Sequence, residues 1–204
     1  MGVYENQILP RLTNLICGIE PLRELRARVA GGLSGTVVEV GFGSGLNLPY
    51  LPAAVDVVLA VDPAVVGRRL AARRLAASPV TVEFVGLDGQ DLPLADASAD
   101  TALSTFTLCT IPEASHALAE LRRVLRPGGT LHFLEHGLSP DPAVARWQHR
   151  LTPLQRRVFG GCHLDRPIDT LVASGGFEVV TLRNYYVRGP KPPGYIYEGV
   201  ARRT

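Results

Sequence analysis

The sequence predicts an α/β protein built on a mostly parallel, doubly wound sheet, and three observations support that prediction. Five short runs, at 36–40, 57–61, 80–85, 101–108 and 130–135, are almost continuously apolar, as strands covered on both faces are. Stretches with helical spacing separate these runs. Two further β-rich runs, at 177–183 and 195–201, lie near the end of the chain. Alternating strands and helices place helices on both faces of one sheet.

Length and composition predict one globular domain over residues 1–204, because hydrophobic residues make up 46% and charged residues 20% of the chain. We expect a helical head at 1–33, a core at 34–138, and the last two strands within 176–204. Between them, residues 139–175 form an insertion too long for an ordinary connection, which is typical of a lid.

Charge and cysteine content exclude several classes of protein. The formal net charge is only +2, and the arginines are scattered over three expected helices, which indicates solvated helix faces and no nucleic-acid partner. No apolar run approaches the roughly 18 residues of a membrane span, so we expect no stable membrane insertion. The three cysteines are far apart and form no Cys-x-x-Cys pair, which predicts a reducing, cytoplasmic location and no structural metal.

The clearest helix is expected at 113–126, where Ala114, Leu118, Leu121 and Leu125 form one apolar stripe. Thr110 and Glu113 have the spacing of a capping box, and the Pro-Gly pair at 127–128 should end the helix. Two short helices are expected in the head. The proline-rich turn at 188–194 is expected not to be helical.

Glycines and carboxylates follow the first two expected strands, where an open α/β sheet binds its ligand. Glu39 precedes a Gly41-x-Gly43-x-Gly45 loop, whose spacing differs from the G-x-G-x-x-G of dinucleotide-binding dehydrogenases. Asp62 ends the second strand, where a ribose would need an acceptor. Asp62 followed by Pro63 is equally suited to cap a helix, and the two roles are compatible.

Five segments in order, at 39–45, 61–63, 86–93, 100–112 and 124–129, resemble the successive motifs of class I S-adenosylmethionine-dependent methyltransferases. The match covers roughly residues 36–135. The resemblance implies a Rossmann-like, seven-stranded, mostly parallel sheet of order 3-2-1-4-5-7-6, with the last strand antiparallel. It also implies that S-adenosylmethionine is the cofactor and S-adenosylhomocysteine the product.

The same resemblance assigns cofactor contacts residue by residue. It implies that the glycine loop faces the methionine and ribose portion, that Asp62 binds the ribose, and that Asp88 with Gly89 meets the adenine. The residues expected at the cofactor are Glu39, Gly41, Gly43, Gly45, Asp62, Pro63, Asp88, Gly89, Thr105, Phe106 and Thr107.

The second half of the chain has a narrower likeness. The segments 134–136, 151–153 and 159–166, with Trp147, are similar to a subgroup of animal small-thiol methyltransferases and bacterial relatives with saccharide or unassigned acceptors. A mannoside 1-O-methyltransferase is one candidate within it. We expect the chain to lack the N-terminal hydrophobic anchor of the animal members, which weakens the expectation of a lipid or thiol acceptor.

We therefore expect methyl transfer to a hydroxyl of a small molecule, with His136 as general base and Glu135 beside it. A hydrogen bond that anchors a loop is the alternative role for His136. The residues expected at the acceptor are Tyr4, Trp147, His149, His163 and Tyr195. Cys109 is expected to be a buried small hydrophobe. No carboxylate motif for Mg²⁺ is evident, so catalysis is expected to need no metal.

Alternative acceptors stay open at this point. Methyl transfer to a thiol or a phospholipid amine is one alternative, and a non-enzymatic nucleotide-binding module on the same fold is another. A monomer and a homodimer are both compatible with the sequence.

Overall fold

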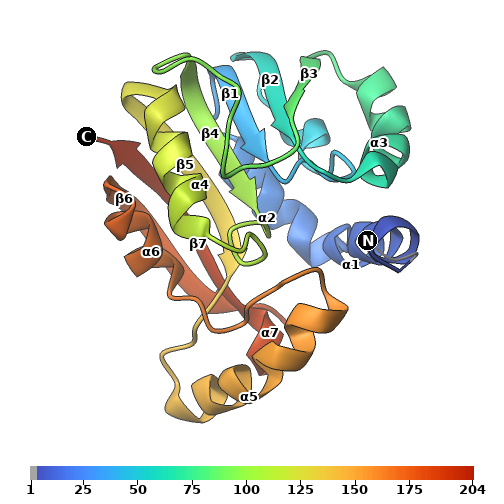
Figure 1. The fold of residues 1–204 in the computed structure, drawn as a ribbon, viewed down its shortest axis with the longest axis vertical. Coiled ribbons are helices and arrows are strands. Elements are labelled where there is room, and N and C mark those ends of the chain that lie inside the picture. Colours follow the sequence, from blue (N-terminus) through green and yellow to red (C-terminus); the bar gives the residue numbers. More distant parts are fainter. Residues whose placement is uncertain (1–3) are drawn as a thin grey trace.

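The fold is one seven-stranded sheet with helices on both faces, as a computed structural model shows for residues 4–204 (Figure 1). The strand order is β3-β2-β1-β4-β5-β7-β6, and β7 pairs antiparallel with both β5 and β6. This confirms the predicted order and the antiparallel last strand. The strands are β1 Gly35–Val40, β2 Val55–Val61, β3 Thr81–Gly86, β4 Ala99–Thr105, β5 Leu125–His136, β6 Phe177–Tyr186 and β7 Tyr195–Arg203.

The helices differ in length and in how much of their surface they bury. A short π-helix at Tyr4–Ile8 leads into α1, and a 3₁₀ turn at Leu48–Tyr50 follows the glycine loop. The α-helices are α1 Leu9–Cys17, α2 Glu20–Ala30, α3 Val65–Ala77, α4 Ala114–Val124, α5 Pro142–Val158, α6 Ile168–Ser174 and α7 Lys191–Gly194. None of the helices in the described part of the chain combines the length and the apolar character needed to cross a bilayer.

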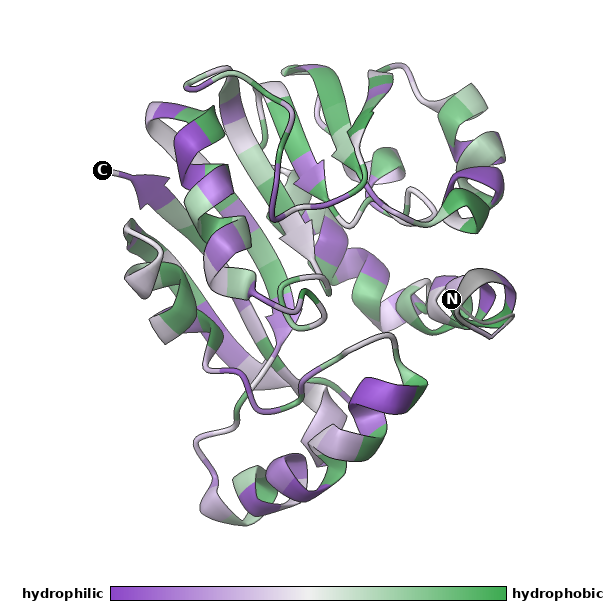
Figure 2. Cartoon of the chain, viewed as in Figure 1, coloured by the Kyte–Doolittle hydropathy of each residue, from purple (hydrophilic) through white to green (hydrophobic). Residues whose placement is uncertain are grey.

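Two hydrophobic cores, one on each face, hold the helices to the sheet. Successive residues of β1 point to opposite faces, so Val37 packs in the core with α2 and α3, and Val38 packs in the core with α4 and α6. Hydrophobic residues accordingly follow the central strands, and the outward surfaces of the helices are largely polar (Figure 2). The near-continuous apolar runs of the sequence are explained by this two-sided burial.

Three local predictions are wrong. The helix expected at 113–126 begins at Ala114 with Glu113 as N-cap and has no side-chain cap, because Thr110 Oγ1 donates instead to the Thr107 carbonyl at 2.8 Å. The strand expected to reach Leu108 ends at Thr105, because Phe106 adopts a φ of 54° and turns the chain. Lys191–Gly194 forms one helical turn despite its prolines, since the first-turn N–H groups need no partner.

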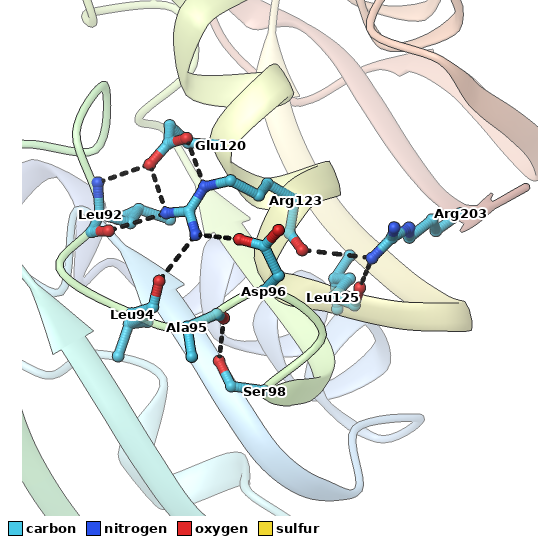
Figure 3. Close-up of polar contacts among 9 residues, drawn as sticks. All are labelled: Leu92, Leu94, Ala95, Asp96, Ser98, Glu120, Arg123, Leu125 and Arg203. Carbon is cyan, nitrogen blue, oxygen red and sulfur yellow. Dashed lines mark hydrogen bonds and ion pairs between the residues drawn. The ribbon is translucent and has the colours of Figure 1, made fainter.

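The arginines do more than solvate helix faces, as Arg123 of α4 shows (Figure 3). Its guanidinium pairs with Glu120 at 2.7 Å and Asp96 at 2.8 Å. It also donates to the carbonyls of Leu92 and Leu94, and so fixes the segment that leads into β4. The prediction of purely solvated arginines is therefore wrong for Arg123.

Candidate functional site

A cavity of about 990 Å³ opens where β1, β2 and β4 end. The glycine loop after β1, Asp62 after β2 and Thr105 to Thr107 at the end of β4 form its floor. The helical head and the insertion close its other side, because Leu9, Cys17 and residues 159–161 also line it. In Figure 1, α1 accordingly lies on the side toward which β1 and β4 run.

The glycine loop needs glycine for two reasons, conformation and space. Gly41, Gly43 and Gly45 have φ values of 75°, 54° and 70°, a region that side chains rarely adopt. A Cβ on Gly41 would lie 2.0 Å from Thr107 Oγ1. A Cβ on Gly43 would meet only the Gly41 carbonyl, at 3.8 Å, so the open side of the loop is the cavity. Gly45 faces the core rather than the cavity.

The carboxylate of Asp62 ties the end of β2 to the glycine loop. Its Oδ2 accepts from the Gly43 amide at 2.7 Å and its Oδ1 from the Ala64 amide at 2.6 Å. Burial raises the pKa of Asp62, and these two backbone hydrogen bonds oppose that shift. The N-cap of α3 is Ala64, so the predicted helix cap at Asp62 is wrong. Asp62 and Pro63 both line the cavity, as expected.

Glu39 lies buried behind the loop, not at the cavity surface. Asn47 Nδ2 donates to its Oε1 at 2.6 Å, and its Oε2 has no partner among the described residues. Burial raises the pKa of Glu39 to about 7, against the lowering effect of the Asn47 hydrogen bond. The site thus contains a buried carboxylate oxygen that can still accept a hydrogen bond.

Arg26 of α2 is a cavity residue that the sequence did not reveal. It is only 4% exposed, and its Nη1 donates to Asn47 Oδ1 at 2.7 Å and to Thr105 Oγ1 at 2.8 Å. Burial lowers its pKa. All its hydrogen-bond acceptors are neutral. Its helical spacing from Leu22 and Val29, which share the buried face, is the signal that could have identified it.

The remaining residues predicted to contact the cofactor also line the cavity. Asp88 and Gly89 follow β3 and line the cavity. Asp88 Oδ1 accepts from the Gln90 amide at 2.9 Å, which shapes this turn. Thr105, Phe106 and Thr107 also line the cavity, and the Arg26 guanidinium lies 5.4 Å from the centre of the Phe106 ring.

Glu135, predicted to be catalytic, is fully buried and does not line the cavity. One of its carboxylate oxygens accepts hydrogen bonds from Ser104 Oγ at 2.8 Å, the Thr107 amide at 3.0 Å and the Leu108 amide at 3.1 Å. Burial raises its pKa, and these bonds oppose the shift. Glu135 therefore fixes the loop between β4 and α4.

His136, predicted to be the base, also lies outside the cavity lining. Its Nε2 is 3.0 Å from Cys162 Sγ, and its Nδ1 is buried without a partner among the described residues. Burial alone would lower the pKa of His136, but the Cys162 contact and the Glu135 charge outweigh it and raise the pKa. This geometry suits the alternative role, an anchor between segments, better than a base.

The structure does not bring the five predicted acceptor residues to the cavity. Trp147 is 55% exposed, and His149 pairs with Asp165 at 2.9 Å. Tyr4 donates to the Val158 carbonyl, and His163 Nδ1 lies 3.2 Å from the Cys109 carbonyl. Tyr195 is buried between Tyr186 and Tyr197. None of the five lines the cavity.

Comparison with known proteins agrees with the geometry. Residues 38–133 match the family described as Methyltransferase domain. Human thiol S-methyltransferase TMT1B is 35% identical over 152 residues, which are 71% of this chain and 62% of that protein. Phosphatidylethanolamine N-methyltransferase of Cereibacter sphaeroides is 28% identical over 186 residues, 87% of this chain and 83% of that protein. This chain thus spans less than two thirds of the human relative.

Solved structures show the same fold. An S-adenosylmethionine-dependent methyltransferase from Thermotoga maritima superposes with a TM-score of 0.68 at 21% identity, over 98% of this chain and 97% of that one. On the motifs, the fold and these relatives together, the chain belongs to the class I S-adenosylmethionine-dependent methyltransferase family.

Proposed function

We propose that the protein transfers the methyl group of S-adenosylmethionine to the sulfur of a small, apolar thiol bound in the cavity. The observation that carries the proposal is the composition of the cavity wall. The side formed by the strand ends contains charged residues such as Asp62 and Asp88. The side formed by the lining residues of 7–17 and 159–161 combines the apolar Leu9, Pro10 and Phe159 with the polar but uncharged Gln7, Thr13 and Asn14.

The side formed by the strand ends suits the cofactor. A methionine carboxylate would meet Arg26, whose hydrogen bonds go only to neutral acceptors. Glu39 acts behind the loop, where it accepts a hydrogen bond from Asn47, which in turn accepts one from Arg26. The ribose hydroxyls would meet Asp62, and the adenine would meet Asp88 and Gly89, while the side-chain-free Gly43 lets the ligand approach the backbone. The cofactor supplies an electrophilic methyl group on a sulfonium sulfur.

The choice of sulfur follows from the groups available to move a proton. Methyl transfer is an in-line displacement, which an enzyme accelerates chiefly by alignment. A hydroxyl acceptor must also lose its proton, whereas a thiol with a pKa of about 8.5 ionises readily. The ionisable residues in the cavity lining are Cys17, Arg26, Asp62, Arg69 and Asp88, and no histidine lines it in the part of the chain that the structure describes. The likeness to thiol S-methyltransferases supports the same acceptor.

The other acceptors remain predictions that one experiment separates. A hydroxyl acceptor with His136 as base was expected from the sequence, and a phospholipid amine is suggested by the relative from Cereibacter sphaeroides. The cytoplasmic location and the oligomeric state, monomer or homodimer, also remain predictions.

The test is a set of acceptors that share one carbon skeleton. The full chain is incubated with methyl-labelled S-adenosylmethionine and an alkyl thiol, the corresponding alcohol or the corresponding amine, with phosphatidylethanolamine vesicles as a fourth arm. We expect S-adenosylhomocysteine and labelled thioether with the thiol alone. Turnover of the alcohol or of the vesicles in preference to the thiol would overturn the proposal.

A further inference from the structure

Two thiols and an imidazole from distant parts of the chain meet beside the cavity. Cys109 lies in the loop after β4, His136 ends β5, and Cys162 lies between α5 and α6. Cys162 Sγ is 3.0 Å from His136 Nε2, and one donor atom from each residue lies within 4.8 Å of the others. Both cysteines are buried, at 1% and 4% exposure.

The donor set and its spacing suit a zinc ion. Thiolate sulfur and imidazole nitrogen are preferred zinc ligands, at about 2.3 Å and 2.0–2.1 Å from the metal. In tetrahedral geometry such ligand atoms lie about 3.6–3.8 Å from one another. The cluster is within reach of that arrangement with side-chain adjustment alone, because its three donor atoms already lie within 4.8 Å of one another.

Hydrogen bonds do not occupy all the nitrogen and sulfur atoms of the cluster. His136 Nδ1 is buried and has no partner among the described residues. The Cys162 sulfur is contacted by His136 and by Gln155 Nε2 at 3.7 Å, which is long for a strong hydrogen bond. The two thiols also lie on separate segments that a shared ion would join. An ion bound by both thiols would hold two segments of the cavity wall together.

We propose that Cys109, His136 and Cys162 bind a zinc ion that clamps one wall of the cavity. Binding replaces the proton of each thiol, so two protons leave for each ion bound. Three protein ligands leave a fourth position for water or another small ligand. The ion joins the 106–113 loop to the 159–163 segment, and both segments contribute residues to the cavity lining. This inference does not depend on the identity of the methyl acceptor.

The primary test measures metal in the purified full chain. After dialysis, we expect one zinc per chain in the wild type, and the same content in Cys17→Ser and His116→Ala. Cys17 lies outside the cluster and His116 is exposed, so these two variants are matched controls. Zinc content should fall at least tenfold in Cys109→Ser, Cys162→Ser and His136→Ala. Undiminished zinc in both cluster cysteine variants would overturn the proposal.

A second measurement uses only the wild type and does not depend on variants that fold. After chelation and reduction, the protein is titrated with Co²⁺. We expect a thiolate-to-cobalt charge-transfer band that saturates at one ion per chain, with release of two protons. Absence of that band would contradict the site. So would a disulfide between Cys109 and Cys162, identified by peptide mapping of the unreduced chain.

Discussion

The carboxylate of Asp62 accepts a hydrogen bond from the Gly43 amide at 2.7 Å, so the end of β2 and the glycine loop form one unit. We expect Asp62→Ala to weaken S-adenosylhomocysteine binding by about 10- to 100-fold, because a hydrogen bond to a charged group contributes about 1.5–3 kcal/mol. Calorimetric titration measures the loss. Asp56→Ala, an exposed aspartate on the same strand, should bind like the wild type. Equal affinities for wild type and Asp62→Ala would remove Asp62 from the site.

Gly41 and Gly43 should respond differently to the same substitution. Gly41→Ala places a methyl group against Thr107, and we expect it to lower the free energy of unfolding by about 1–3 kcal/mol beyond its backbone strain. Gly43→Ala should lower the free energy of unfolding only by the backbone strain, about 1–2 kcal/mol. It should also weaken cofactor binding. Gly128→Ala is the control for strain, because Gly128 has a φ of 78° and nothing within 4 Å. Chemical denaturation of the three variants checks the order.

Arg26 is expected to bind the carboxylate of the cofactor. Arg26→Gln should weaken S-adenosylhomocysteine binding by at least about 10-fold, the effect of one charge-assisted hydrogen bond. Methylthioadenosine lacks that carboxylate, so its affinity should be unchanged in the same variant. Titration with both ligands makes the comparison. An equal loss for both ligands would mean that Arg26 acts through the shape of the site and not through the carboxylate.

Ionisation of Glu39 is expected to destabilise the free protein. Folding raises the pKa of Glu39 from 4.5 to about 7. The resulting loss of folding stability is therefore absent well below pH 4.5 and increases with pH up to about pH 7. At 1.36 kcal/mol per pKa unit, it reaches about 3 kcal/mol above pH 7. Glu39→Gln should therefore be more stable than the wild type at pH 8 and nearly equal at pH 4.5.

Denaturant unfolding at the two pH values measures that difference. Glu83→Gln, an exposed glutamate on β3, is the control and should follow the wild type at both. A stability difference that is the same at both pH values would contradict a buried, ionising Glu39.

The pKa of the acceptor should determine the pH dependence of turnover. No histidine lines the cavity in the described part of the chain, and we assign its carboxylates, Asp62 and Asp88, to the cofactor. The rate should therefore rise tenfold per pH unit until the acceptor thiol ionises, near pH 8.5 for an alkyl thiol. An aryl thiol of lower pKa should reach its plateau at correspondingly lower pH. Initial rates for the two thiols across pH 6–9 test this. One common midpoint for both acceptors would instead identify an ionising group of the enzyme.

The sheet and the residues that line the cavity at its strand ends could be predicted because short-range patterns specify them. Two-sided burial makes strands such as β1 read as apolar runs, and Gly41, Gly43 and Asp62 lie in motifs fixed to the strand ends. Even there, the end of β4 was missed, because the positive φ of Phe106 has no signature in a non-glycine residue.

The acceptor side could not be predicted, because packing between distant segments decides it. His136 follows a strand, which made it a candidate base, but its side chain meets Cys162 from the insertion. The cluster with Cys109 has no motif spacing, so the cysteines gave no sign of a metal site. Arg26 lies in a helix that is rich in charged residues, and only its place on the apolar stripe distinguishes it from the other arginines of that helix.

Calorimetric titration of the full chain with S-adenosylhomocysteine, run beside Gly43→Ala, is the most direct test of the cofactor site. We expect saturable binding of one ligand per wild-type chain, and a loss of affinity in a variant that remains folded by circular dichroism. Absence of binding to the wild type, or equal binding to the folded Gly43→Ala variant, would contradict the assignment of this cavity to the cofactor.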